Sequence, residues 1–372
     1  MESVISYKTM TLLLLHILVV FLIPNGAVGQ NKKPLTITKV ALDTKTFDPS
    51  KGEAVNLSYE INKQTDAKVS IFDVLGQEVK CFNLTGLESG RHSVTWDGLT
   101  ANGKQASGNV FLYSIEASDG QNKTTYNPAA ETGGGLVKPW EFIFDKKSGK
   151  VEYVLPKACM IRLRAGLNNG MMARTIFDWQ PRPAGRHTYK WDGKDEAGLM
   201  NLSNHPELDL HLSCYTLPSN TIIVTGQIVP LKSYGKDSKD KTATNKESDP
   251  WARAGKYLHY THNPRNCHEP RFTVKFPNRK DTNEQSDPTV SGITQIRIEL
   301  DKRDANYLIN KRFEIILYVD GIYIFEMEEG SAPFTFNWNT KGLTKGPHIL
   351  TVNLMSYDGH IGVVSRRILV EE

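Results

Sequence analysis

Four side chains of the kinds that bind metal ions lie close together in the sequence: His259, His262, Cys267 and His268. Imidazole nitrogens and thiolates are the usual protein ligands of zinc and copper. Their spacing matches no standard zinc pattern, and no Cys-x-x-Cys-His sequence for haem attachment is present. Two interpretations stay open: a metal site or an axial ligand lent to a partner's haem, and solvated loop histidines. We predict the second, and therefore no cofactor.

No catalytic signature accompanies these residues. The sequence lacks a nucleophilic serine elbow, a dinucleotide fingerprint and a zincin motif. The triple glycine Gly133-Gly134-Gly135 is not followed by the Lys-Ser/Thr pair that completes a phosphate-binding loop. No two carboxylates are spaced in a way that demands acid–base catalysis. We expect a protein that is not an enzyme.

A repeated motif organises the chain. Residues Gly90 to Gly98 read GRHSVTWDG and recur from Gly185 to Gly193 as GRHTYKWDG, about one sandwich domain further on. A more distant copy near the C-terminus runs from Phe334 to Thr340. Alternating runs such as Val55 to Ile61 precede the copies and are typical of strands with one solvated face. The pattern predicts an all-β fold of tandem immunoglobulin-like β-sandwich domains.

The motif residues have a structural interpretation. A tryptophan on an alternating strand buries a large area and fixes two sheets together. The following aspartate suits a turn in which its carboxylate accepts backbone N–H bonds, and the glycine supplies positive φ. The competing interpretation is a ligand-binding aromatic beside a carboxylate. We predict structural roles for Trp96, Asp97, Gly98, Trp191, Asp192 and Gly193.

The first motif copy belongs to a longer pattern. Together with Phe47-Asp48-Pro49-Ser50, Val69 to Gly76 and Ser107 to Tyr113, it resembles the flagellar-hook-cap type of Ig-like domain over about residues 34–118. The second copy, at about 140–230, keeps the core of the motif, and the C-terminal copy resembles a generic bacterial Ig-like repeat. The resemblance implies a β-sandwich in an exported bacterial protein.

The N-terminus resembles an export signal. Lys8 precedes an apolar run from Thr11 to Ile23, which is shorter than the roughly 20 residues that span a bilayer. Ala27-Val28-Gly29 provides the small residues that a signal peptidase recognises. We expect a cleaved signal peptide, no integral membrane segment after cleavage, and a mature protein in the periplasm, an equivalent compartment or the extracellular space.

These observations predict a domain order. The expected parts are a signal peptide at 1–29, Ig-like domain 1 at 30–120, a Gly-rich linker at 121–139, Ig-like domain 2 at 140–230, a polar loop with an aromatic and His-containing insert at 231–290, and Ig-like domain 3 at 291–372. Export permits disulfides without requiring them. Cys159 and Cys214 are the pair to test for a bridge, and buried free thiols are the other interpretation.

The insert carries the excess positive charge, with twelve Lys and Arg against eight Asp and Glu between Leu231 and Val290. Its second part, Trp251 to Pro277, is too apolar for a free linker. It packs either on the last domain or on a partner protein. Tyr, Trp and Arg dominate interface hot spots, so the candidate interface residues are Trp251, Arg253, Tyr257, Tyr260 and Arg271.

The expected function is that of a non-catalytic structural or assembly subunit. It would bind other exported proteins, for example by organising a larger exported enzyme complex or a filament. A surface adhesin or carbohydrate-binding protein is the alternative. A metal- or haem-associated redox accessory protein is a further alternative. Nucleic acid is not an expected partner, because basic and acidic residues alternate in the insert.

Overall fold

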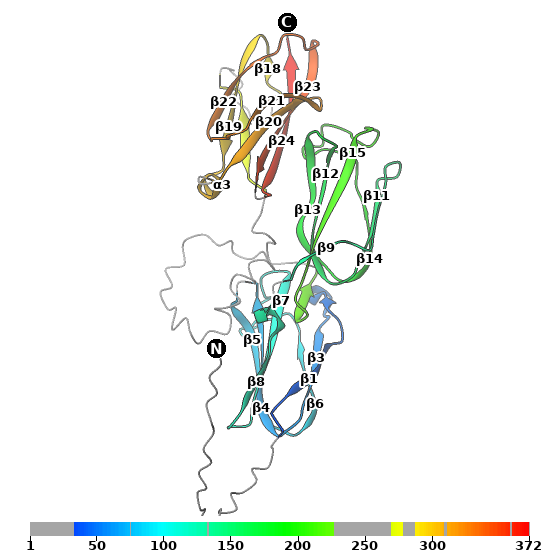
Figure 1. The fold of residues 1–372 in the computed structure, drawn as a ribbon, viewed down its shortest axis with the longest axis vertical. Helices are drawn as coiled ribbons and strands as arrows, with labels where there is room; N and C mark the ends of the chain where they lie inside the picture. The colour runs from blue at the N-terminus through cyan, green and yellow to red at the C-terminus, as the bar shows by residue number, and fades with distance from the viewer. Residues whose placement is uncertain are drawn as a thin grey trace, which may run out of the picture. The chain divides into compact units, whose positions relative to one another are not determined.

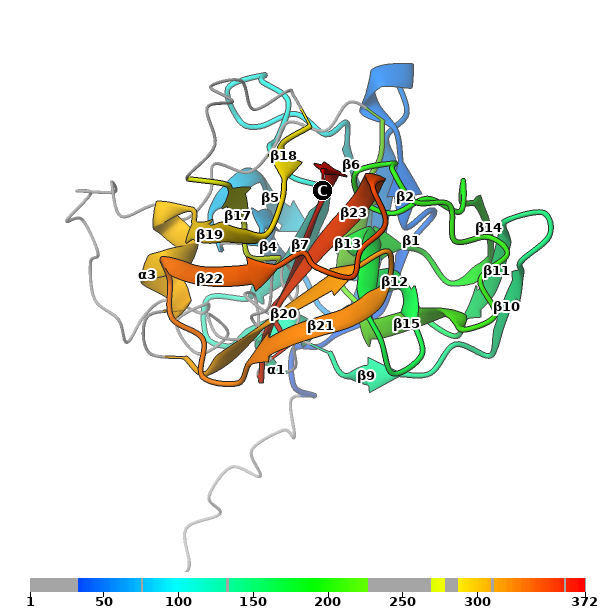
Figure 2. The same ribbon diagram turned by 90° about the horizontal axis from the view of Figure 1, so that it is seen from above.

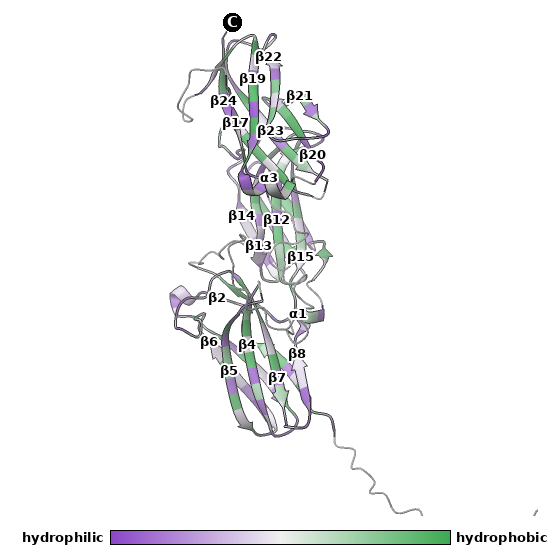
Figure 3. Ribbon diagram, turned by 90° about the vertical axis from the view of Figure 1, so that its left-hand side faces the viewer, coloured by the Kyte–Doolittle hydropathy of each residue, from purple (hydrophilic) through white to green (hydrophobic). Residues whose placement is uncertain are grey.

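The strands of this chain form three β-sandwiches, drawn in Figure 1, and this confirms the predicted all-β fold class. The structure is a computed structural model that describes residues 33–74, 76–131, 134–226, 269–277, 287–308, 311–357 and 359–371. The predicted signal peptide at 1–29 lies outside these residues. Helices are short, and along the strands apolar residues alternate with polar ones (Figure 3). Such alternation buries one face of each sheet.

The first sandwich combines a sheet of three strands with a larger sheet. The three-stranded sheet has the order β1-β3-β6, and the larger sheet has the order β2-β16-β7-β4-β5, with β8 paired to β7. The strands are β1 (Ile37–Leu42), β2 (Thr46–Phe47), β3 (Val55–Ile61), β4 (Thr65–Asp73), β5 (Glu78–Leu87), β6 (Gly90–Trp96), β7 (Val110–Ser118), β8 (Lys123–Tyr126) and β16 (Thr221–Val224), and the 3₁₀ turn η1 spans Pro49–Lys51.

Strand β16 reaches this sheet from far along the chain. It pairs antiparallel with β7 and parallel with β2, so that Ile222 lies opposite Phe111 and Ile223 opposite Thr46. In Figure 1 it is the light green strand among the blue and cyan strands. The predicted second domain, 140–230, includes these residues. The chain therefore leaves the first sandwich, builds the second and returns to complete the first.

The second sandwich also has two sheets, with the strand orders β10-β11-β14 and β13-β12-β15-β9. The strands are β9 (Leu136–Val137), β10 (Glu141–Asp145), β11 (Lys150–Leu155), β12 (Cys159–Leu167), β13 (Met172–Arg182), β14 (Gly185–Lys190) and β15 (Leu208–Thr216). Residues 121–139, predicted as a Gly-rich linker, contain β8, the helix α1 (Pro128–Glu131) and β9. Since β8 and β9 pair with β7 and β15, much of this segment belongs to the two sandwiches.

The third sandwich has the strand orders β17-β19-β22 and β18-β24-β23-β20-β21. Its elements are β17 (Phe272–Lys275), β18 (Thr289–Val290), β19 (Ile293–Leu300), α3 (Lys302–Leu308), β20 (Phe313–Val319), β21 (Ile322–Met327), β22 (Phe334–Asn339), β23 (Gly346–Ser356) and β24 (Ile361–Val370). Strands β17 and β18 lie within the predicted insert, 231–290, yet they pair with β19 and β24. The third sandwich thus begins before residue 291.

Each sandwich has its own core. In the first, the Trp96 ring makes edge contacts with Phe47 and Phe111, at centroid distances of 5.6 and 4.9 Å. Strand β7 is buried along most of its length, because α1 covers Leu112 on one face while the opposite sheet covers the other. A smaller cluster joins the first two sandwiches: Val74, Val110 and Ile223 contact Met160, Trp179 and Leu217.

Candidate functional site

The first copy of the repeated motif forms a buried turn. Trp96 is 2% exposed, and its Nε1 donates to the carbonyl oxygen of Leu99 at 2.9 Å. The Oδ1 of Asp97 accepts the backbone N–H of Leu99 at 3.0 Å, which is the Asx turn that the sequence predicts. Gly98 has a φ of +82°, and an added Cβ would lie 2.7 Å from Pro49 Cγ. These contacts place the motif inside the fold.

The second copy repeats the Asx turn but not the hydrogen bond of the indole, since Trp191 Nε1 has no partner among the residues that the structure describes. Trp191 is also 2% exposed, and the Oδ1 of Asp192 accepts the backbone N–H of Lys194 at 3.1 Å. Arg174 Nη1 lies 3.2 Å from the same oxygen. At Gly193, with φ +75°, an added Cβ would lie 1.8 Å from Ser203 Oγ. The geometry of both copies is that of a structural turn, and both tryptophan rings are buried.

The histidines of the first two copies, and His348 after the third copy, are held alike. Nε2 of His92, His187 and His348 lies 2.8, 2.9 and 2.7 Å from the carbonyl oxygen of the residue four positions earlier. His348 also contacts the Asp320 carboxylate through Nδ1. Burial lowers the pKa of His348, but the hydrogen bonds that it donates to the Asp320 carboxylate and the Thr344 carbonyl outweigh it, so that its pKa lies above the ordinary value. These contacts tie each imidazole to the backbone of the turn that precedes it.

The predicted metal ligands His259, His262, Cys267 and His268 lie outside the described residues, so their arrangement stays a prediction. Within the described ranges, no three His, Cys, Asp or Glu side chains are close enough to hold a metal ion together. No helix in the same ranges is long and apolar enough to cross a membrane.

The predicted partner interface is only partly described. Trp251, Arg253, Tyr257 and Tyr260 lie outside the described residues. Arg271 is exposed, and its backbone N–H donates to Asp304 Oδ2 at 2.7 Å. The neighbouring Phe272 and Val274 are buried in the core of the third sandwich. The end of the apolar segment therefore completes that core, which was the competing interpretation.

Cys159 and Cys214 are free thiols buried on neighbouring strands. Cys159 lies opposite Thr216, and Cys214 lies opposite Ile161, so the two cysteines are diagonal neighbours. Diagonal Cα atoms on paired strands are typically about 7–8 Å apart, which is wider than most disulfides accept. Burial raises the pKa of Cys159 to about 11 and that of Cys214 to about 12, so both stay protonated at neutral pH.

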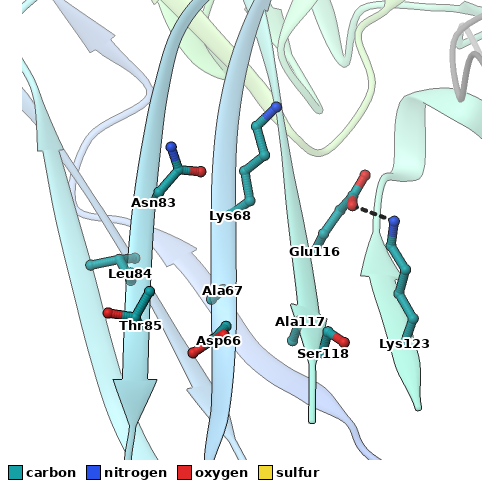
Figure 4. A pocket seen from close by; sticks show the side chains of 10 residues that line it. All are labelled: Asp66, Ala67, Lys68, Asn83, Leu84, Thr85, Glu116, Ala117, Ser118 and Lys123. Carbon is teal, nitrogen blue, oxygen red and sulfur yellow. Dashed lines mark ion pairs between the residues drawn. The ribbon is translucent and has the colours of Figure 1, made fainter. Parts of the chain in front are cut away.

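A shallow depression of about 330 Å³ lies on the outer face of the first sandwich, over β4, β5, β7 and β8 (Figure 4). Its charged groups already have partners within the chain. Lys123 Nζ lies 2.6 Å from Glu116 Oε2, and Asp66 Oδ1 accepts the backbone N–H of Gly86 at 2.8 Å. No aromatic ring lines it, so it offers no stacking surface for a sugar.

Exposed apolar side chains lie at two sheet edges. Trp140 is 73% exposed and Ile143 54%, both at the edge strand β10. Ile322 is 71% exposed and Tyr323 56%, both at the edge strand β21. No sequence motif pointed to these residues. The alternation in Glu141–Asp145 was the available signal, because it places Ile143 on the same face as two carboxylates.

Solved structures with similar folds match at low identity. FlgD from P. aeruginosa is 18% identical, with 25% of this chain and 71% of that chain covered and a TM-score of 0.21. Truncated FlgD from Helicobacter pylori is 16% identical, with 42% and 91% covered and a TM-score of 0.19. A tetra-tandem repeat from the extending region of a large adhesion protein is 12% identical, with 91% and 74% covered and a TM-score of 0.20. No curated protein matches the chain.

The match to a protein family falls on the first sandwich. It begins just before β2 and ends at the turn before β8, and so includes the buried Trp96 turn but not β16. This range overlaps the region, about 34–118, in which the sequence resembles the flagellar-hook-cap type. Residues 44–122 match the FlgD Ig-like domain, and the predicted resemblance of the first sandwich is thereby confirmed.

Proposed function

We propose that this chain is a non-catalytic assembly subunit, exported from the cytoplasm, that binds other exported proteins through the edges of its sandwiches. The observation that supports this most is the exposure of large apolar side chains at β10 and β21. Edge strands bind extended segments of other chains through their backbone groups, and neighbouring side chains add area and specificity. Several domains in one chain can contact several partners at once, as in an enzyme complex or a filament.

The chemistry of the described groups is better suited to binding than to catalysis. The repeated histidines hold turns, and the buried thiols of Cys159 and Cys214 have raised pKa values that make them poor nucleophiles. The depression on the first sandwich is open, and its Lys123 and Glu116 neutralise each other. Export is proposed from the signal peptide predicted at 1–29 and from the family of the first sandwich.

A glycan-binding adhesin is the second candidate. Exposed aromatic rings favour it, because sugars stack on such rings: Trp140 and Tyr357 are both largely exposed. This function requires the isolated chain to bind glycans as a monomer. Assembly requires a protein partner instead, so binding to a glycan panel separates the two.

Affinity capture from the exported fraction of the native organism tests the proposal. We expect one protein partner to bind the full chain in a fixed ratio. The double variants Trp140→Ser/Ile143→Ser and Ile322→Ser/Tyr323→Ser should each reduce its recovery, because they remove apolar contact area. Lys33→Glu/Lys104→Glu, at two exposed lysines in a part of the chain that contains neither β10 nor β21, is the matched control. Glycan binding with no protein partner would contradict the proposal.

A further inference from the structure

Two sheet edges of this chain carry features that suit them to each other. Strand β10 pairs only with β11, and β21 pairs only with β20, in the part of the chain that the structure describes. Figure 2 shows each of them at the margin of its own sheet. The outer backbone groups of an edge strand form a template for a further strand. Each edge is therefore able to accept one.

Two other edges of the molecule, at β1 and β14, are protected. Strand β1 has a register shift between Thr38 and Ala41, and Lys39 within it has a φ of +48°. Strand β14 presents Arg186, Thr188 and Lys190 to solvent. Bulges and charged side chains are the usual means by which proteins prevent pairing between edges. By contrast, β10 pairs with β11 without a bulge and exposes Trp140 and Ile143. Strand β21 has one register shift in its pairing with β20, between Leu317 and Tyr318, but it still exposes Ile322 and Tyr323.

The two edges have opposite charge. Between Lys138 and Lys150, four lysines stand against two carboxylates, whereas Asp320 to Glu329 contains four carboxylates and no basic residue. Lys146, Lys147, Glu328 and Glu329 are all exposed. Their contacts within the chain are modest: Lys146 Nζ lies 3.2 Å from the carbonyl oxygen of Pro206, and Glu329 lies 3.7 Å from Arg312.

On both edges, a pair of charged residues follows the exposed apolar residues. If β10 and β21 run parallel with Trp140 near Ile322, then Lys146 and Lys147, just after β10, lie near Glu328 and Glu329, just after β21. The antiparallel arrangement would instead bring the lysines to Asp320, whose carboxylate already contacts His348 and the Ile349 N–H. The pairing of opposite charges therefore favours the parallel arrangement of β10 and β21.

We propose that copies of this chain associate by adding β10 of one copy to β21 of the next, in this parallel register. This inference rests on the proposed assembly function and names a second copy as one partner. The contact joins two different surfaces, so it repeats from copy to copy and gives an open chain unless the rotation closes a ring. Part of the attraction is between exposed charges, so it weakens as salt rises.

Sedimentation of the purified full chain tests the proposal, with no partner protein present. We expect association that grows with protein concentration and declines as salt is raised. Lys146→Glu/Lys147→Glu and Glu328→Lys/Glu329→Lys should each weaken association about ten-fold or more. A mixture of the two variants should restore it, because each acidic β10 then meets a basic β21, and the remaining edges keep their native charges.

Lys33→Glu/Lys104→Glu is again the matched control and should associate like the native chain. Circular dichroism and thermal melts establish that every variant is folded. A native chain that stays monomeric at low salt, or a mixture that associates no better than its components, overturns the pairing of β10 with β21. Either result leaves capture of a different protein from the exported fraction unaffected, so the two proposals can fail separately.

Discussion

Each sandwich holds its buried tryptophan through the residue that follows it. Asp97, Asp192 and Asn339 each accept a backbone N–H two residues on, at 3.0, 3.1 and 3.1 Å. A side-chain oxygen in this position closes an Asx turn, and Asp and Asn provide it equally well. The third copy, with Asn339 and Thr340 in place of Asp and Gly, therefore keeps the turn although its sequence has diverged.

Replacing the buried tryptophans with alanine tests how much they contribute to the free energy of unfolding. Trp96→Ala and Trp191→Ala should each lower the free energy of unfolding by about 3–5 kcal/mol, because a large buried ring leaves a cavity. Trp140→Ala is the matched control and should change it little, since that ring is mostly exposed. Urea unfolding followed by circular dichroism gives the three values. An equal, small effect for all three would contradict a core role.

The His348–Asp320 contact predicts a pH dependence for the third sandwich. The pKa of His348 is raised in the folded state, so protonated His348 stabilises the third sandwich fully at pH values below the ordinary pKa of about 6.5. This stabilisation is lost as the pH rises through the pKa of the folded state. Asp320→Asn removes the negative charge and keeps an oxygen for the Ile349 N–H. The melting temperature of this variant should fall further below that of the native chain at pH about 5.5 than at pH about 8.5.

Native and variant proteins are melted at both pH values, with Asp301→Asn as a control for a general effect of charge. Asp301 is exposed on the same sandwich. A deficit that is the same at both pH values would show that the charge on His348 does not contribute to stability.

At the scale of elements, β16 determines how the first two sandwiches depend on each other. The buried Asn220, which lies just before β16, donates from Nδ2 to the carbonyl oxygen of Tyr113 at 2.6 Å. The backbone carbonyl oxygen of Asn220 accepts the backbone N–H of Tyr113 at 3.1 Å. Ile222 and Val224 then enter the core of the first sandwich. The first sandwich is therefore incomplete without residues that follow the second.

Fragments of the chain test this dependence. A fragment of residues 33–131 should fail to unfold cooperatively, because β7 loses one of its partner strands, β16, and the core loses two apolar side chains. A fragment of residues 33–226 should unfold cooperatively. In that longer fragment, Asn220→Ala should cost about 1–3 kcal/mol, while Ser219→Ala, at an exposed neighbour, should cost little. A stable 33–131 fragment would show that β16 is dispensable.

The sequence allowed the strands and the tryptophan turns to be predicted, because alternation and Asx turns are local patterns. The position of β16 could not be predicted in this way. Thr221–Val224 is buried at every position, and a short apolar run does not indicate which sheet will cover it. The exposure of Trp140 was missed for a similar reason: tryptophan is usually buried, and only the pairing of β10 at a sheet edge leaves it in solvent.

At the scale of the whole molecule, consecutive sandwiches are linked by specific contacts. The Asn353 side chain on β23 exchanges two hydrogen bonds with the backbone of Met172 on β13, both 2.8 Å long. Arg162 on β12 donates to the carbonyl oxygen of Gly359 at 3.3 Å. Because a buried amide with both groups paired is costly to separate, we expect the second and third sandwiches to unfold together.

The size and composition of the particle that contains this protein in its native organism test the central claim most directly. The exported fraction is separated by size under native conditions, and every protein that comigrates with the chain is quantified. The account predicts that the chain migrates in a particle much larger than a monomer, with another protein in a fixed ratio to it. Migration as a monomer without a comigrating protein would contradict the assembly function.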